Sequence, residues 1–352
     1  MRIAFTHNLQ LTDSEEEAEF DSWTTVAALT EALTRLGHAV EPVEVSGPAS
    51  RTVARLEALA PDLIFNTAEG RSGRYREAFY PGLFEQLGIP YTGSDAYVCA
   101  LTLDKQLTKL VLAARGVRTP NWCFVEDMRR FSPPALDYPV IVKPNFEGSS
   151  KGISSESIVH APEELTAKVG AALARYPSGV LVEEFIVGRD VVVPLLEGAS
   201  PQTEGVLAAV EYGFGSSPAA RGGYQIYDYT LKHGRSCEVV VRCPAELTPE
   251  LELELRGMSR TAYKALGVRD FGRIDFRVTP EGRAYFLEIN ALPSLEPGAG
   301  LYASAALAGL ETVEDVLRTV IEGAAERQHV TRLGPRDAPA AAMSATREPI
   351  TG

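Results

Sequence analysis

The sequence lacks the features of a membrane or exported protein. No window approaches the roughly 18 consecutive apolar residues that a membrane-spanning helix needs. The N-terminal MRIAFTHNLQ contains neither an apolar segment of signal-peptide length nor a cleavage-like run of small residues. We therefore expect a cytoplasmic protein that does not associate with membranes.

Basic residues and cysteines are also scarce. The 34 Lys and Arg residues are outnumbered by 47 Asp and Glu, a formal charge of −13, which disfavours a protein that coats nucleic acid because phosphate contacts need a basic face. The four cysteines have neither CxxC spacing nor a neighbouring histidine cluster, so neither a zinc site nor a redox pair is indicated. We expect buried free thiols at Cys99, Cys123, Cys237 and Cys243.

The first 95 residues alternate strand-like and helix-like segments, a pattern typical of a parallel, doubly wound sheet. The G-x-G-x-x-G fingerprint of dinucleotide-binding proteins is absent after the first strand, which disfavours a nicotinamide-dependent enzyme. Because 352 residues exceed what one compact core usually supports, we expect further domains beyond this one.

The rest of the chain predicts two more units. The segment LTLDKQLTKLVLAARG (residues 101–116) has the pattern of one helix that ends at a glycine, and another helix is expected from Pro162 to about Arg175. From about residue 180 onward, a run of strands is interrupted by the helix TPELELELRGMSRTAYKALG. This arrangement favours an α+β unit with a largely antiparallel sheet.

The segment FGRIDFRVTPEGRAYFLEIN has the period-2 pattern of a β-hairpin. A two-residue turn at residues 281–282 places Asp275 directly opposite Glu288, and a four-residue turn keeps both on the same face. Two facing carboxylates repel each other unless a cation lies between them. Together with Asn290 they form an oxygen-only set that suits Mg²⁺.

The alternative for these acids is a solvated sheet face on which they pair with Arg273 and Arg277. The loop EGSSKG after the strand VIVK weighs against that alternative. Its consecutive backbone N–H groups can bind phosphate oxygens, while Lys143 and Lys105 supply positive charge. The spacing differs from G-x-x-x-x-G-K-[ST], which excludes a Walker loop, and an ordinary Gly-Ser turn is the alternative. Metal ligands and a phosphate loop together indicate ATP.

The motifs TLDK, VIVKP, EGSSKG, VLVEEFIVGRD, YDYTLK, GRID and LEIN follow one another in an order that resembles the ATP-grasp superfamily and, within it, the D-alanine:D-alanine ligase family. The resemblance covers about residues 1–325. It implies α/β and α+β units in a three-domain ATP-grasp architecture, with a parallel N-terminal sheet and a largely antiparallel C-terminal sheet. The implied parts are an N-terminal α/β substrate domain (1–95), a central ATP-grasp subdomain (96–182), a C-terminal ATP-grasp subdomain with the metal site (183–328) and a flexible tail (329–352).

The resemblance also assigns roles to individual residues. Lysines hold the ATP phosphates, a hinge segment meets adenine through its backbone, and a carboxylate at Asp190 binds the ribose. The implied ATP-binding residues are Lys105, Lys143, Ser150, Glu183, Glu184, Phe185, Ile186 and Asp190. The implied metal ligands are Asp275, Glu288 and Asn290, for two Mg²⁺ ions with Mn²⁺ as an alternative, and the implied catalytic residues are Arg273, Ser149 and Lys232.

Several substrate positions depart from the family pattern. His233 follows Lys232 where the family has a tyrosine that bonds to the phosphate-loop serine. Related ligases that accept a hydroxy acid also have histidine there, although a solvent-facing histidine is the alternative. Glu69 replaces a histidine and Ser294 replaces a glycine. The N-terminal glutamate of the family corresponds to one of four residues, Glu15, Glu16, Glu17 or Glu19, of which Glu19 is our candidate.

Arginines at positions 71, 74 and 76 follow Glu69. They are expected either to clamp a substrate carboxylate or to form the charged first turn of a surface helix. At the far end, Ala299 and Gly300 stand where the family has a serine and a leucine that receive the D-alanine carboxylate. Changed substrate positions beside preserved ATP positions predict a paralogue that joins something other than two D-alanines.

The function implied is that of an ADP-forming carboxylate–amine ligase that joins amino acids through an acyl-phosphate intermediate. One alternative is a cell-wall D-alanine:D-alanine or D-alanine:D-lactate ligase. Another is a non-catalytic nucleotide-binding module, which the preserved Lys143, Arg273 and metal ligands disfavour. The expected partners are small molecules, with no nucleic acid and no membrane. Dimerisation is common in the family, so a homodimer is one expected state, although the sequence itself does not indicate it.

Overall fold

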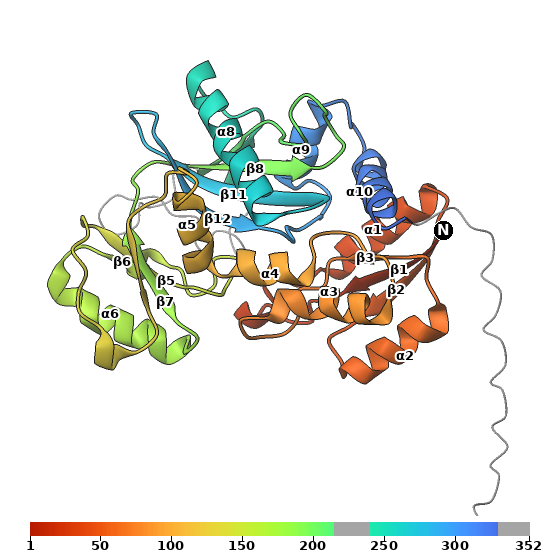
Figure 1. Cartoon of the computed structure of the whole chain (residues 1–352), viewed down its shortest axis with the longest axis horizontal. Coiled ribbons are helices and arrows are strands. Elements are labelled where there is room, and N and C mark those ends of the chain that lie inside the picture. The colour runs from red at the N-terminus through yellow and green to blue at the C-terminus, as the bar shows by residue number, and fades with distance from the viewer. Residues whose placement is uncertain (215–238, 330–352) are drawn as a thin grey trace, which may run out of the picture.

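The computed structural model describes residues 1–214 and 239–329, and these residues form three β-sheets with flanking helices (Figure 1). The N-terminal sheet has the strand order β2-β1-β3 and is parallel, as the sequence predicts. Its strands are β1 (Arg2–His7), β2 (Ala39–Glu44) and β3 (Leu63–Asn66). The central strand β1 is buried from Ile3 onward, as expected when helices cover both faces of a parallel sheet.

The helices of this N-terminal part are α1 (Trp23–Arg35), α2 (Ala49–Leu59), α3 (Arg76–Leu87) and the short 3-10 helix η1 (Glu15–Glu17). Helix α1 begins after Ser22, whose hydroxyl accepts a hydrogen bond from the Thr25 backbone N–H at 3.1 Å. Its buried residues Val26, Leu29 and Leu33 recur at helical spacing and face the sheet side of the core.

The predicted single helix over residues 101–116 is wrong. The chain instead forms α4 (Ala96–Leu103) and α5 (Lys105–Ala113), interrupted at Asp104, whose backbone is extended. The Asp104 carboxylate accepts hydrogen bonds from the Leu107 backbone N–H at 3.1 Å and from the Asn145 amide at 2.8 Å. The break therefore caps α5 and places Lys105 at its first position.

The central sheet has the order β4-β7-β5-β6 and is antiparallel throughout. Its strands are β4 (Trp122–Val125), β5 (Val140–Pro144), β6 (Ile158–Val159) and β7 (Val180–Glu184). Helix α6 (Pro162–Arg175) packs against it with the predicted bounds, and the 3-10 helices η2 (Met128–Arg130) and η3 (Ser155–Ser157) lie in its connections. In Figure 1 this sheet and α6 occupy the end of the molecule opposite the N-terminal sheet.

The C-terminal sheet has the order β10-β9-β8-β11-β12 and is also antiparallel, as predicted. Its strands are β8 (Arg189–Leu196), β9 (Val210–Phe214), β10 (Val239–Arg242), β11 (Phe271–Val278) and β12 (Ala284–Asn290). Helix α8 (Pro249–Leu266) packs on this sheet through Leu251, Leu255 and Ala262. Its N-terminus is capped by the Thr248 hydroxyl, which accepts from the Leu251 N–H.

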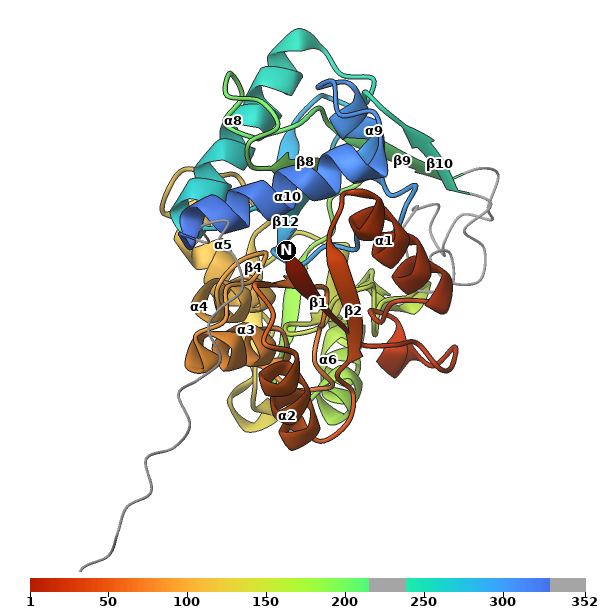
Figure 2. The same cartoon turned by 90° about the vertical axis from the view of Figure 1, so that its right-hand side faces the viewer.

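The last helices of the described chain, α9 (Gly300–Ala306) and α10 (Val313–Arg327), return to the N-terminal part. Figure 2 shows α10 beside α1. One hydrophobic core contains Phe5 and Leu29 from the N-terminal part together with Phe271 and Val320 from the C-terminal part. The first and third sheets are therefore held by a shared core, and the domain limits expected from the sequence stay a prediction.

Two further expectations concern the whole chain. Among the described helices, none combines the length and apolar character that crossing a bilayer requires. Of the cysteines, Cys99 is a buried free thiol as expected, whereas Cys123 and Cys243 are only half-buried because they lie near sheet edges and loops. Cys237 lies outside the described residues.

Candidate active site

A cavity of about 680 Å³ lies where the three sheets meet. Its wall includes the loops after β1 and β3, the loop after β5, the end of β7 and the hairpin β11–β12. Every predicted site residue within the described parts of the chain lines it, namely Glu19, Glu69, Lys105, Lys143, Ser149, Ser150, Glu183, Glu184, Phe185, Ile186, Asp190, Arg273, Asp275, Glu288, Asn290 and Ser294. Lys232 and His233 lie outside the described residues.

The hairpin places Asp275 opposite Glu288 and Arg273 opposite Asn290. The Arg273 guanidinium donates to both Asp275 oxygens, at 2.7 and 2.8 Å. The expected alternative of an Arg273–Asp275 pair is thus present, but the pair lines a cavity rather than an open sheet face. Arg277 does not join it, because its guanidinium binds Asp190 instead.

The second acid of the hairpin is held by a lysine. Lys105 Nζ lies 3.2 Å from Glu288 Oε2 and also donates to the Glu147 backbone carbonyl at 2.5 Å. Burial opposes ionisation of Glu288, but Lys105, Lys143 and Arg273 together lower its pKa to about 2. The carboxylate is therefore fully ionised at neutral pH.

The ligand set fits a divalent cation by its chemistry. Asp275, Glu288 and Asn290 offer only oxygen donors from two adjacent strands, and all three line the cavity. The Asn290 Oδ1 already accepts from the Leu292 backbone N–H at 2.7 Å, which fixes the start of the following loop. Hard oxygen ligands of this kind suit Mg²⁺ or Mn²⁺ rather than zinc or copper.

The loop after β5 has a left-handed backbone at two successive residues. Ser149 and Ser150 have φ of 49° and 58°, a tight turn of the kind that can present backbone N–H groups to an anion. A side chain at position 148 would meet the Glu19 carboxylate, which would have to shift away from it. The loop is therefore shaped by its contact with an N-terminal residue more than 100 positions away.

The same contact identifies which N-terminal glutamate reaches the cavity. Glu15 pairs with Arg175 and accepts from the Gly152 N–H, and Glu17 accepts from the backbone N–H of Thr12. Glu16 is exposed. Glu19 lines the cavity and binds Lys151 and Arg76, which selects it among the four candidates.

A buried lysine that sequence reasoning missed, Lys109, lies close to Lys143, which the sequence predicts as a phosphate ligand. Lys143 Nζ donates to Glu183 Oε1 at 2.5 Å, and Lys109 Nζ lies 3.0 Å from Glu183 Oε2. The signal was available, since Lys109 follows Lys105 by four positions and therefore shares its helix face. Glu183 thus has a side-chain role in addition to the hinge position expected for it.

The predicted hinge is held by two side chains, Asn121 and Arg277, and by one backbone hydrogen bond. The Glu184 carboxylate accepts from the Asn121 amide at 3.0 Å, and the Phe185 N–H donates to the Pro139 carbonyl. The Arg277 guanidinium donates to the Ile186 carbonyl at 3.0 Å and stacks 5.1 Å from the Phe185 ring centroid. Arg277 Nη1 donates to both carboxylate oxygens of Asp190, the predicted ribose ligand, at 2.8 and 2.9 Å.

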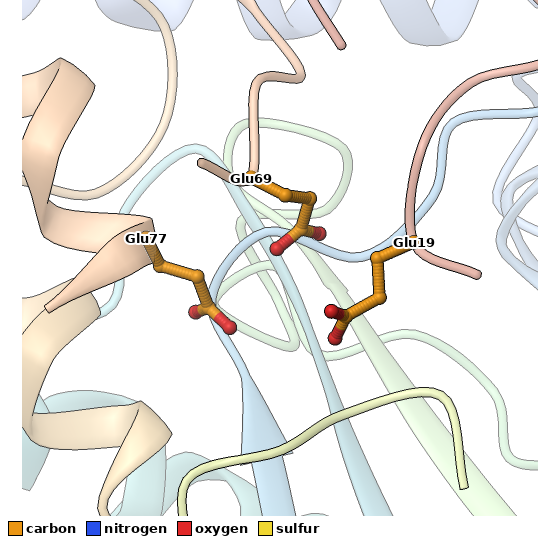
Figure 3. A group of neighbouring side chains, drawn as sticks. All are labelled: Glu19, Glu69 and Glu77. Atoms are coloured by element: carbon orange, nitrogen blue, oxygen red, sulfur yellow. The ribbon is translucent and has the colours of Figure 1, made fainter. Parts of the chain in front are cut away.

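Three glutamates converge at the N-terminal end of the cavity, as Figure 3 shows for Glu19, Glu69 and Glu77. The Arg76 guanidinium bridges all three, at 2.9, 3.4 and 3.0 Å respectively. Because a cationic side chain already joins these carboxylates, the cluster needs no metal ion. Arg76 is the first residue of α3, as expected for a charged first turn, but its side chain is buried and pairs with these carboxylates.

The acidic end is short of positive charge. Burial, with Glu77 and Glu19 nearby, raises the pKa of Glu69 well above its usual range, and burial raises the pKa of Glu77 to about 7. Asp21 also lines the cavity, and burial raises its pKa to about 7 although the Thr67 hydroxyl donates to it. Sequence reasoning missed Glu77 and Asp21, because nothing local distinguishes them from surface acids.

The loop after β12 closes the cavity on the remaining side. Ser294 lines the wall, and its hydroxyl accepts from the Glu296 backbone N–H at 3.2 Å. Ala299 and Gly300 line the same wall at the start of α9. A side chain on Gly300 would press on the Tyr212 hydroxyl and Val210, so a small residue is required there.

Comparison with known proteins agrees with this geometry. A sequence model described as the D-ala D-ala ligase C-terminus matches residues 111–322. A D-alanine–D-alanine ligase from Haemophilus influenzae (strain PittEE) is 33% identical over 313 residues, covering 87% of this chain and 96% of the relative. One from Aquifex aeolicus (strain VF5) is 34% identical over 269 residues, covering 76% of this chain and 84% of the relative.

The fold agrees as well. The crystal structure of a D-alanine–D-alanine ligase from Bacillus anthracis superposes with a TM-score of 0.74 at 25% identity, covering 94% of this chain and 99% of the other. The match includes all three sheets, since so little of either chain is left out. The chain therefore belongs to the D-alanine–D-alanine ligase family of ATP-grasp proteins, and it is an ATP-dependent, ADP-forming ligase that makes a carbon–nitrogen bond.

Proposed function

We propose that this ligase binds ATP between the phosphate loop and the β11–β12 hairpin and uses it to join two amino acids. The observation that carries the proposal is the gathering of two lysines, an arginine and three oxygen ligands on the wall of one cavity. Lys105 and Lys143 would hold the phosphate groups with the backbone N–H groups of Ser149 and Ser150. The backbone of the hinge, Glu183 to Ile186, would meet the adenine, and Asp190 the ribose.

We propose Asp275, Glu288 and Asn290 as the residues that hold divalent cations, two in number. When bound, Mg²⁺ neutralises charge on the transferring phosphoryl group. The chain's own contribution is to hold Glu288 ionised through Lys105 and to keep Arg273 aligned by Asp275. Arg273, Ser149 and Lys232 are the proposed catalytic residues, of which Arg273 can stabilise developing negative charge from its place in the wall.

The reaction we propose has two steps. The carboxylate of one amino acid attacks the γ-phosphorus of ATP, which releases ADP and forms an acyl phosphate. The amine of the second substrate then attacks the acyl carbon, phosphate leaves with the bonding electrons, and the amine loses a proton to give the amide. Holding the reactants together in a cavity accounts for much of such a rate enhancement.

The cavity has two electrostatic poles that suit an amino acid. The lysines and Arg273 lie at the pole of the phosphate loop and hairpin, and Asp21, Glu69 and Glu77 line the N-terminal pole. Glu19 lies between the two, because it also pairs with Lys151 of the phosphate loop. An amino acid placed with its carboxylate at the first pole and its ammonium group at the second matches both. Glu19, Glu69, His233 and Ser294 are therefore our proposed substrate-binding residues.

We propose that the substrates are not two D-alanines, because the second pole holds a buried acidic cluster at Glu69. D-Alanine:D-alanine ligation, named for the relatives, is the second candidate, with D-alanine:D-lactate ligation as its variant. A panel of L- and D-amino acids with Mg-ATP, read by phosphate release and product mass, separates these. D-Alanyl-D-alanine as the best product would contradict the proposal of altered substrates.

A homodimer is a separate proposal, and sedimentation of the same sample tests it.

A further inference from the structure

Lys109 is a fully buried lysine that the proposed reaction does not use. It belongs to α5, and its Nζ donates to the Thr119 hydroxyl at 2.6 Å and to the Phe286 carbonyl of β12 at 3.4 Å. The same nitrogen lies 3.0 Å from Glu183 Oε2 on β7. Lys109 therefore ties the central sheet to the C-terminal sheet, but it does not line the cavity and cannot touch a ligand there.

Glu183 is shared between this lysine and a lysine of the cavity. Its side chain is 2% exposed, with Lys143 on one oxygen and Lys109 on the other. Burial alone would raise the pKa of Glu183, but the two lysines lower it, so the carboxylate carries a full negative charge. A buried charge of this kind must keep at least one counter-ion to be tolerated.

Lys143, the lysine on the cavity wall, has a second proposed partner besides Glu183. Lys143 lines the wall at the end of β5, directly before the phosphate loop, and it is our proposed phosphate ligand. Its 2.5 Å contact with Glu183 competes with any anion in the cavity. If Glu183 had no other cation, Lys143 could move toward phosphate only by leaving a buried carboxylate unpaired.

We propose that Lys109 is a positioning residue, which keeps Glu183 neutralised so that Lys143 can exchange that carboxylate for the phosphates of ATP. The proposal rests on the proposed binding of ATP by Lys143. It assigns Lys109 an effect on nucleotide affinity that passes through Glu183 and involves no contact with the nucleotide. Affinity for the amino acids should depend on Lys109 much less, because we place their ammonium groups at the N-terminal pole, away from Glu183.

The test measures Mg-ATP binding by calorimetry and KM values by phosphate release for the full chain and its variants. Lys109→Met is expected to weaken Mg-ATP binding by about tenfold or more, with the KM for amino acids changed by less than about threefold. The matched control is Lys264→Met, which removes a lysine whose side chain is 65% exposed and pairs with Glu204. It should leave both quantities within about twofold of the parent.

A double variant shows whether the effect passes through Glu183. In a Glu183→Gln background the amide needs no counter-ion, so adding Lys109→Met should weaken Mg-ATP binding by less than about threefold. Multiplicative effects of the two substitutions, or tight Mg-ATP binding by folded Lys109→Met, would overturn the proposal. If Lys109→Met alone does not fold, Glu183→Gln is compared with Glu183→Gln/Lys109→Met. A loss of Mg-ATP affinity of tenfold or more between these two variants would overturn the proposal. Failure of the parent protein to bind Mg-ATP would instead refute the proposed function.

Discussion

Asp275 lies directly opposite Glu288 across the β11–β12 hairpin, and each carboxylate has its own cation, Arg273 for the first and Lys105 for the second. Repulsion between the two acids is thereby offset on the cavity wall. A divalent ion arriving with ATP would meet carboxylate groups that are already held in place.

Removing either acid of this pair should abolish metal-dependent turnover. Asp275→Asn and Glu288→Gln are each expected to lower phosphate release by about 100-fold or more, because each loses an anionic ligand of the proposed metal site. Glu281→Gln, in the exposed turn of the same hairpin, is the control and should retain activity. Chelation by EDTA should stop the parent enzyme, and added Mg²⁺ should restore it. Activity that survives chelation would contradict the assignment.

Arg76 is expected to be the main electrostatic support of the acidic end. Arg76→Met leaves Glu19, Glu69 and Glu77 without their common cation, so the free energy of unfolding should fall by about 3–5 kcal/mol in urea titrations at neutral pH. The control is Arg129→Met, whose side chain is 89% exposed and pairs with a neighbouring acid, and no measurable change in the free energy of unfolding is expected there. Similar losses in both variants would count against the role of Arg76.

Asp21 should make the protein less stable as pH rises. Burial raises its pKa from 3.8 to about 7, so between about pH 4 and pH 7 the folded state binds more protons than the unfolded state. Stability due to this group is therefore highest at low pH and is lost as pH approaches 7. Asp21→Asn should raise the melting temperature at pH 8 and change it little at pH 4.5. An equal change at both pH values would refute this account.

Arg277 should control ATP affinity through the hinge. It binds Asp190 and the Ile186 carbonyl and stacks on Phe185, so Arg277→Lys loses a planar, bidentate contact while keeping the charge. The KM for ATP should rise by about tenfold, with a smaller change in kcat, in steady-state assays. Arg283→Lys, in the hairpin turn, should leave both constants unchanged. An unaltered KM for ATP in Arg277→Lys would show that the hinge does not bind the nucleotide as proposed.

The sequence correctly predicted that Asp275 lies opposite Glu288, but it predicted the wrong turn for this hairpin. The expected two-residue turn would pair Pro280 with Arg283, but the structure closes the turn between Thr279 and Arg283. Gly282, at φ 77°, supplies the left-handed position that this longer turn needs. A bulge at Leu287 then shifts the register back by one. Bulges depend on packing between strands, which the alternation of residues does not reveal.

The helix break at Asp104 was hidden for a related reason. Locally, residues 101–116 have good helix formers, and only the distant Asn145 amide shows why Asp104 leaves the helix. Arg76 with Glu19, and Lys109 with Glu183, likewise join positions more than 50 apart in the chain. Strand patterns predicted the sheets, because those follow from local periodicity, and motif order picked out residues that the fold brings to the wall of one cavity. These ion pairs could be identified only from the three-dimensional structure, because they join residues far apart in the sequence.

ATP-driven amide formation in this cavity is tested most directly by phosphate release from Mg-ATP with paired amino acids, coupled to mass spectrometry of the product. We expect phosphate only when amino acids are present, one ADP per phosphate, and a product whose mass equals the two substrates less one water. Phosphate released at the same rate without amino acids, or amino-acid-dependent release with no joined product, would contradict it.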